Sequence, residues 1–362
     1  MIGLVLNRSI RRDDRIRSVA IVIPVHNAEA NIEAKILNCL QADYPVEART
    51  IWVVSDGSTD GTVEIAGRYR DRNVRCLEIP ERVGKVAAQN RALPLLDAEV
   101  IVFTDVGIKV GRHALWHIVS DFGDPTVGVV SCRDQIAAGV PGAGGEGIYI
   151  AYDMRVRDLT NRTGSLIGVT GGFYALRREL AETPWDPACP PDFFVALRAI
   201  EAGYRVVQDE RVLAAYAVTA MPSGEFARKV RTMTRGMFAL WGHLHLLNPV
   251  RHGLASYQLL GQKLLRWMTP FFLIGLLICS ALLLESQHAA GIYRIFVAAQ
   301  VILYALGALG LWVAGGNSRL KRYLEGPGFF LMSNAAILAS WWNLATGKRY
   351  TVWEPTKRAS WD

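Results

Sequence analysis

Residues 52–61 read Trp-Val-Val-Ser-Asp-Gly-Ser-Thr-Asp-Gly, an apolar strand that ends in a turn carrying two carboxylates. Residues 62–66, Thr-Val-Glu-Ile-Ala, predict a helix directly after the turn, so Asp56 and the first N–H groups of that helix should face one crevice. Residues 100–105, Val-Ile-Val-Phe-Thr-Asp, repeat the pattern. Open α/β sheets bind nucleotides at the carboxyl ends of their strands, so two acid-tipped strands predict a nucleotide site with a divalent metal.

Short apolar runs alternate with helical patterns over roughly the first 215 residues. This alternation predicts an α/β fold with a largely parallel, doubly wound sheet. Glycines crowd residues 139–147 and predict a loop there. Helices are expected to begin near residues 32, 62, 86, 148 and 193. The expected strands are 19–24, 51–54, 74–79, 100–104, 127–132, 173–176, 205–207 and 212–215.

Apolar residues make up 51% of the 362 residues, and they concentrate toward the C-terminal end. Three stretches without charge lie at 267–284, 295–318 and 326–347. Each has about the 20 residues that cross a bilayer as a helix, which predicts about three transmembrane segments. Buried core helices are the alternative, above all for the third stretch, where Ser and Asn residues interrupt the apolar run.

The charge distribution predicts which side of the membrane the domain faces. The formal net charge is +7, and Lys and Arg flank the apolar stretches. The short link at residues 285–293 contains neither Lys nor Arg. Residues 1–18 are basic and lack an apolar core, so no signal peptide is expected and the domain should be cytosolic. The five cysteines lack metal-binding spacing, and aromatics are not interleaved with the basic residues, which argues against nucleic-acid binding.

Residues 225–247 predict a basic amphipathic helix. Apolar residues recur at spacings of three and four, and Arg and Lys occupy the other face. Such a helix suits an anionic membrane surface, which is the interpretation its position before the first apolar stretch favours. A helix packed on the globular core, with its basic face in solvent, is the alternative.

Polar residues at the predicted strand ends are the candidates for the donor side of a site. Asn27 and Glu29 follow the first strand and could hold a base or ribose, although such turns also form Asx turns and helix caps. Asp60 fits the cap of the helix from residue 62, which leaves Asp56 free to meet a ligand. Lys85 follows a glycine and could approach a phosphate, or be a surface lysine.

Three further positions complete the candidate site. Asp105 follows a strand that reads as buried, where an unpaired carboxylate is costly unless a cation meets it; a divalent ion would do so, with Lys109 as the alternative partner. Gly171 and Gly172 precede a strand and allow close approach of a substrate, or relieve a tight bend. Asp192 stands before a helix and two aromatic residues, which suits a general base or a helix cap.

Together these motifs resemble the family-2 glycosyltransferases, in particular the membrane-bound bacterial polysaccharide-synthase branch. The resemblance rests on the order and spacing of Ile-Pro-Val-His-Asn-Ala-Glu, Val-Ser-Asp-Gly-Ser-Thr-Asp-Gly-Thr, Gly-Lys, Phe-Thr-Asp, Gly-Gly-Phe-Tyr-Ala-Leu-Arg-Arg, Pro-Asp-Phe-Phe and Ala-Gly-Tyr-Arg-Val. It implies the GT-A fold, a nucleotide-diphosphate sugar, usually Mg²⁺ or Mn²⁺, and inversion at the anomeric carbon.

The resemblance also implies roles for individual residues. Pro24, Asn27, Glu29 and Asp56 would hold the uridine end of the donor, and Lys85 would contact the nucleotide or its phosphates.

On the reacting side, Asp105 would face the metal and the diphosphate. Gly171 and Gly172 would line the acceptor side. Asp192 would deprotonate the acceptor hydroxyl.

Two motifs depart from the family pattern. The usual Asp-x-Asp of the metal site is Asp105-Val106-Gly107 here, so a weaker or absent metal is an open alternative. Processive synthases carry Gln-x-x-Arg-Trp, whereas residues 262–267 read Gln-Lys-Leu-Leu-Arg-Trp, with one residue too many. Arg231 or Arg235 could instead meet the diphosphate, or contact lipid head groups.

The sequence therefore predicts an inverting glycosyltransferase of a bacterial inner membrane that transfers a sugar to a growing polysaccharide or a lipid-linked glycan. Membrane lipids, and other polysaccharide-assembly proteins, are its expected partners. A single-addition enzyme on a polyprenyl-linked acceptor and a non-catalytic nucleotide-binding subunit are the alternatives. The predicted regions are a basic segment 1–18, a GT-A domain 19–222, interfacial helices 223–266, about three transmembrane segments in 267–347 and a basic tail 348–362.

Overall fold

The computed structural model describes residues 8–136, 144–216, 225–285, 290–313 and 319–351. Within these residues one mixed sheet has the strand order β3-β2-β1-β4-β7-β6-β8-β5. Strands β1 to β4 are mutually parallel, whereas β7 and β5 run antiparallel to their neighbours. The strands are β1 (Val19–Val25), β2 (Arg49–Asp56), β3 (Val74–Ile79), β4 (Val100–Thr104), β5 (Ile108–Val110), β6 (Val127–Ile136), β7 (Phe173–Arg177) and β8 (Arg205–Tyr216).

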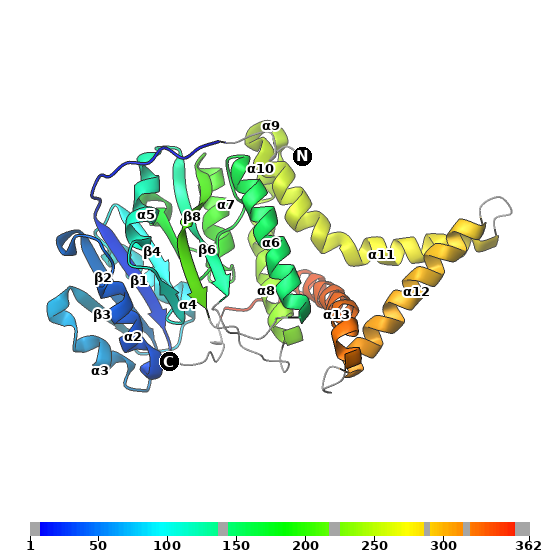
Figure 1. Cartoon of the computed structure of the whole chain (residues 1–362), viewed down its shortest axis with the longest axis horizontal. Helices are drawn as coiled ribbons and strands as arrows, with labels where there is room; N and C mark the ends of the chain where they lie inside the picture. The colour runs from blue at the N-terminus through cyan, green and yellow to red at the C-terminus, as the bar shows by residue number, and fades with distance from the viewer. Residues whose placement is uncertain (1–7, 137–143, 217–224, 286–289, 314–318, 352–362) are drawn as a thin grey trace.

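Helices cover both faces of this sheet (Figure 1). Every residue of β1 is buried, because alternate side chains enter two cores: Ala20 and Val22 lie in one, and Ile21 and Ile23 in the other. The expected α/β fold is confirmed. The helices of this part are α2 (Glu29–Leu40), α3 (Thr62–Gly67), α4 (Lys85–Ala92), α5 (Ala114–Ser120), α6 (Gly144–Arg162) and α7 (Pro191–Glu201).

Three local expectations differ from the structure. The two short strands expected at 205–207 and 212–215 are one strand, β8, which stays paired to β6 through register shifts. The strand β5 was not expected, because it is short and begins directly after the turn that contains Asp105. Of the expected loop 139–147, residues 139–143 lie outside the described part, and α6 already begins at Gly144.

The C-terminal region forms a second group of helices. Two of them, α11 and α12, project away from the sheet as a V, and α13 returns to it (Figure 1). Two segments of the described chain, Leu254–Leu282 and Gly291–Val313, are long and apolar enough to cross a membrane. The elements are α8 (Glu225–Trp241), α9 (Pro249–His252), α10 (Leu254–Leu259), a π turn (Leu260–Leu264), α11 (Leu265–Leu282), α12 (Ala290–Val313) and α13 (Arg319–Ala345).

The third apolar stretch lies in α13, which packs along α8. Two of its polar residues contact that helix: the hydroxyl of Ser340 donates to the Val230 carbonyl at 3.2 Å, and the amide of Asn343 donates to the Thr234 hydroxyl at 3.3 Å. Ser340 and Asn343 therefore bind a protein neighbour, and a third transmembrane segment stays a prediction.

The amphipathic helix expected at 225–247 exists as α8, and part of its apolar face is covered. Val230, Met237 and Leu240 are buried where α8 packs against α13 and α7, whereas Phe226 and Trp241 are exposed. The buried part agrees with the alternative interpretation, a helix packed on the protein core, and contact of α8 with a membrane surface stays a prediction.

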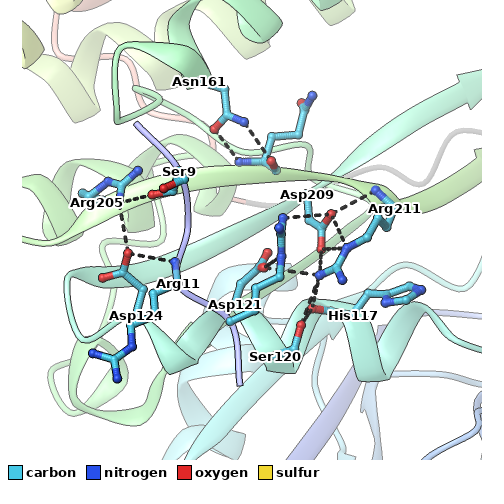
Figure 2. A network of polar contacts seen from close by, with 12 residues as sticks. Ser9, Arg11, His117, Ser120, Asp121, Asp124, Asn161, Arg205, Asp209 and Arg211 are labelled. Carbon is cyan, nitrogen blue, oxygen red and sulfur yellow. Dashed lines mark hydrogen bonds and ion pairs between the residues drawn. The ribbon is translucent and has the colours of Figure 1, made fainter. Parts of the chain in front are cut away.

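The basic N-terminal segment is fastened to the sheet domain by ion pairs (Figure 2). Arg12 donates to Asp121 at 2.8 Å and lies 3.7 Å from Asp209, which Arg211 of the same strand β8 also bonds at 2.6 Å. Both carboxylates are almost fully buried. Burial, and then the neighbouring charge of Asp209, raise the pKa of Asp121 to about 7.

This raised pKa predicts a pH-dependent stability. Between about pH 4 and pH 7 the folded protein holds a proton on Asp121 that the unfolded chain releases, so the free energy of unfolding falls as pH rises, by up to about 1.4 kcal/mol per pH unit. Asp121→Asn should remove this loss. Urea titrations at pH 5 and pH 8 should show the variant gaining stability relative to wild type at the higher pH. Asp14→Asn, at an exposed acid of the basic N-terminal segment, should keep the same difference in stability between the two pH values as wild type. Parallel pH dependence in wild type and Asp121→Asn would contradict the assignment.

Candidate active site

Parallel pairing brings the polar residues at the strand ends to one edge of the sheet. β1 pairs with β2 from Val19–Arg49 to Val25–Ser55, and with β4 from Val19–Val100 to Val22–Phe103. The segments that follow β1, β2 and β4 therefore lie side by side. They carry Asn27 and Glu29, Asp56, and Asp105 respectively, as the sequence predicted.

The first two of these segments bind each other through side chains. The amide oxygen of Asn27 accepts the Thr59 N–H at 2.9 Å, and the carboxylate of Glu29 accepts the Gly61 N–H at 3.1 Å. Asp60 accepts the N–H of Thr62 at 3.1 Å, but the N-cap of α3 is Gly61, so the expected cap role of Asp60 was wrong by one residue. Asn27 and Glu29 thus hold the loop, and their contact with a nucleotide stays a prediction. Pro24 is buried in β1 opposite Val54, so it contributes backbone to this edge.

Asp56 is engaged, and the expectation of a free carboxylate was wrong. Its two oxygens accept the N–H groups of Val83 at 2.7 Å and Gly84 at 2.9 Å. The carboxylate therefore fixes the loop that leads to Lys85. Each oxygen keeps a second acceptor position, so a role of Asp56 toward the donor stays a prediction.

Lys85 and Asp105 form an ion pair across the edge. The ammonium lies 2.5 Å from the Asp105 carboxylate, and the two side chains are 14% and 21% exposed, so both can be reached from solvent. Lys85 is therefore the partner of Asp105, and Lys109 is exposed. The backbone N–H of Asp105 donates to the Gly172 carbonyl at 3.0 Å, which joins the donor side to the predicted acceptor side.

Asp192 lies at the first turn of α7, and Gly171 passes close to it. A Cβ at Gly171 would be 3.6 Å from the Asp192 carboxylate, and the Asp192 carbonyl accepts the Val169 N–H at 3.1 Å. A Cβ at Gly172 would meet Ile108 at 2.9 Å, so this glycine serves packing. The predicted neighbourhood of Gly171 and Asp192 is thus present.

Tyr174 is a residue that the sequence interpretation missed. It is fully buried on β7, and the charges of both Asp192 and Asp105 reach its hydroxyl; burial first, and then these charges, raise its pKa well above the usual value. Tyr174 therefore lies within electrostatic reach of both carboxylates. The sequence feature that could have identified it is a tyrosine inside the buried strand Phe-Tyr-Ala-Leu, because burial of a hydroxyl is unfavourable without a polar partner.

Arg235 supports the loop before Asp192. Its guanidinium donates to the carbonyls of Cys189 at 2.7 Å and Pro187 at 3.3 Å, and burial lowers its pKa although the charge of Asp192 counteracts this. Arg231 lies one turn earlier on α8 and interacts electrostatically with Arg235. Arg235 thus clamps the loop, and contact of either arginine with a diphosphate stays a prediction.

A divalent metal would find one protein ligand at this edge. Among the residues that the structure describes, no group of three or more His, Cys, Asp or Glu side chains could enclose a cation. Asp105 offers a carboxylate, and Gly107 stands where the family usually has a second one. The site therefore fits a metal through Asp105 only, with the remaining ligands from elsewhere.

Residues 20–183 match the profile of "Glycosyl transferase family 2". This segment, less than half of the chain, resembles the family-2 glycosyltransferases. It contains β1 to β7 and most of the candidate residues, while Asp192 lies just beyond its end.

The curated relatives of this chain are distant. The β-monoglucosyldiacylglycerol synthase of Nostoc sp. is 32% identical over 123 residues, which is 33% of this chain and 26% of the relative. Glycosyltransferase AglE of Haloferax volcanii is 25% identical over 230 residues, or 62% of this chain and 74% of the relative. The chain thus spans about a quarter of the cyanobacterial relative.

One solved structure shares the architecture of nearly the whole chain. It is the mannosyltransferase PcManGT from Pyrobaculum calidifontis in complex with GDP-Man and Mn²⁺. The match has a TM-score of 0.66 at 21% identity and covers 96% of this chain and 92% of the other. This likeness establishes the GT-A-like fold, including the C-terminal helices.

The turn after β2 yields a prediction. Gly57 has a φ of +65°, and a Cβ there would lie 2.7 Å from the backbone nitrogen of Arg82. Gly57→Ala should push away the loop that holds Lys85, lower the free energy of unfolding by about 1–3 kcal/mol and weaken nucleotide binding. Calorimetric titration with UDP and GDP, and thermal unfolding, measure both effects.

Gly67→Ala is the matched control, because nothing lies within 4 Å of the added methyl group at the end of α3. It should leave nucleotide binding unchanged. Equal behaviour of the two variants would show that the turn after β2 does not shape the nucleotide site.

Proposed function

We propose that this protein is a membrane-associated inverting glycosyltransferase that moves a sugar from a nucleotide-diphosphate sugar to a hydroxyl of a lipid-linked acceptor. The observation that carries the proposal is that Gly171 and Gly172 join the two carboxylates: the Asp105 N–H donates to the Gly172 carbonyl at 3.0 Å, and a Cβ at Gly171 would lie 3.6 Å from the Asp192 carboxylate. A donor diphosphate beside the Lys85–Asp105 pair would put the anomeric carbon near Asp192. UDP is the nucleotide that the sequence resemblance favours.

The donor side offers recognition for each part of the nucleotide. Asn27, Glu29 and Asp56 present acceptor oxygens to base and ribose at the edge where β1 and β2 end. Lys85 presents an ammonium for the diphosphate. In the free protein this ammonium is paired with Asp105, so the pair holds the cation in position before the donor arrives.

The reaction needs one base and one stabilised leaving group. The acceptor oxygen attacks C1 of the sugar, the bond from C1 to the diphosphate oxygen breaks, and the nucleoside diphosphate leaves with the electron pair. Asp192 takes the hydroxyl proton. Attack from the side opposite the leaving group inverts the anomeric configuration. Arg235 holds the loop on which Asp192 sits, so it positions the base.

A Mg²⁺ or Mn²⁺ ion would be held by Asp105 together with the phosphates of the donor. When bound, such an ion neutralises charge that develops on the departing diphosphate. The Mn²⁺ in the structure of the mannosyltransferase supports this proposal.

The acceptor is proposed from the C-terminal helices. Two segments of the described chain could span a membrane, and α13 returns to the domain; this is little material to enclose a channel for a polymer. A single addition to a lipid-linked acceptor therefore fits better than processive synthesis. A relative that is named as a synthase of β-monoglucosyldiacylglycerol supports a lipid acceptor. A non-catalytic subunit would have no use for Asp192 beside Gly171.

Replacement of the base tests the proposal. Asp192→Asn should lower sugar transfer by roughly 10²–10⁴-fold, because the amide cannot accept the proton, while binding of the nucleoside diphosphate stays nearly intact. The measurement is product formation by purified protein in lipid nanodiscs, with a panel of UDP- and GDP-sugars. Asp97→Asn, at an exposed acid far from α7, should transfer like wild type. Full activity in Asp192→Asn would show that Asp192 is not the general base.

The single metal ligand gives a second prediction. Mn²⁺ should bind weakly to the free protein and more than tenfold more tightly once UDP or GDP supplies phosphate oxygens. Asp105→Asn should abolish this coupling, as electron paramagnetic resonance of Mn²⁺ can show. Transfer that is unaffected both by EDTA and by Asp105→Asn would instead leave Lys85 as the cation at the diphosphate.

A further inference from the structure

A second cavity of about 610 Å³ lies away from the edge of the strands. It opens between α6, residues 166–168, the π turn and the first turns of α11. Three cations line it, Arg157, Lys263 and Arg266, against one carboxylate, Asp153. The lining is therefore positively charged.

The cations are held in defined positions. Arg157 bonds Asp153 at 3.1 Å and donates to the carbonyl of Gly168 at 3.3 Å, so it braces the wall of the cavity. The ammonium of Lys263 lies 4.6 Å from the centre of the Phe193 ring, which stabilises a cation in a partly apolar place.

The cavity adjoins the proposed base. Lys263 is close enough to Asp192 for electrostatic attraction, and Phe193 follows Asp192 directly. Gly168 lines the cavity, and the next residue, Val169, donates its N–H to the Asp192 carbonyl. The cavity therefore lies next to the segment that carries Asp192.

The other end of the cavity lies where the first apolar segment begins. Phe272 and Leu265 line it and are 56% and 45% exposed, and both belong to the candidate span Leu254–Leu282. A ligand with an anionic head and an apolar tail matches this arrangement, because the head would meet the cations and the tail would continue along α11.

The π turn explains how the sequence builds this place. Residues 262–267 contain one residue more than the Gln-x-x-Arg-Trp spacing, and the π turn at Leu260–Leu264 accommodates an additional residue in the helix. Gln262, Lys263 and Arg266 all line the cavity as a result.

We propose that this cavity binds the diphosphate of a lipid-linked acceptor, with the lipid chain along α11 and the first sugar directed toward Asp192. The inference rests on the proposed transferase function and names its acceptor class. A neutral glycolipid or a bare glycan offers no anion to three cations, and a free nucleotide has no tail for the apolar opening.

Binding of a soluble short-chain analogue tests the cavity directly. Farnesyl diphosphate should bind the full chain in detergent micelles, measured by titration calorimetry, whereas farnesol and inorganic pyrophosphate should each bind more than about tenfold more weakly, since either lacks one half of the ligand. Lys263→Met should weaken farnesyl diphosphate binding roughly tenfold and leave UDP or GDP binding unchanged. Arg251→Met, an exposed cation on α9 with the same loss of charge, should bind all ligands like wild type.

The outcomes separate the two proposals. If farnesyl diphosphate fails to bind, or binds Lys263→Met as tightly as wild type, the cavity is not an acceptor site, while sugar transfer that depends on Asp192 would still uphold the enzyme. Binding of inorganic pyrophosphate as tight as that of farnesyl diphosphate would show an anion site without a lipid role. Lys263-dependent binding in a protein that turns over no nucleotide sugar would uphold the lipid site and end the proposed function.

Discussion

The in-register parallel pairing of β1 with β2 and β4 is the constraint on which the site depends. It places the carboxyl ends of three strands beside each other, although Asn27, Asp56 and Asp105 are far apart in the chain. A shift of one residue in this register would turn every buried side chain of β1 to the opposite face, and both cores would lose their contacts. The hydrophobic pattern of the strands thus fixes the geometry of polar residues that contribute little to the cores themselves.

The loops at this edge are held by their own carboxylates and amides. Asp56 accepts two backbone N–H groups of the Lys85 loop, and hydrogen bonds to charged groups stabilise by roughly 1.5–3 kcal/mol each. Lys85 then meets Asp105 before any donor is present. The same acidic residues that would recognise a nucleotide therefore also organise the free site, which reduces the entropy lost on binding.

Strand positions and strand-end residues could be read from the sequence, because apolar runs with an acid at one end have a direct spatial meaning in a parallel sheet. The partners of those residues could not. The pairing of Lys85 with Asp105, and the electrostatic influence of Asp105 and Asp192 on Tyr174, depend on tertiary packing. The periodicity of α8 predicted an amphipathic helix but not its protein neighbour, since Ser340 and Asn343 of α13 show their function only once they meet Val230 and Thr234. The cavity beside Lys263 is lined by α6 and α11, which are about 100 residues apart in the sequence. No local sequence pattern predicts that these two helices lie close together.

The central claim is that one nucleotide-diphosphate sugar lies across the ends of β1, β2 and β4 with its anomeric carbon facing Asp192. An experimental structure of the full chain in lipid nanodiscs with a non-hydrolysable UDP- or GDP-sugar tests it most directly. The account predicts density for the base near Asn27 and Asp56, a diphosphate in contact with Lys85, and the sugar between Asp105 and Asp192. A nucleotide bound elsewhere, with the Lys85–Asp105 pair unchanged and Asp192 in a separate cavity, would contradict it.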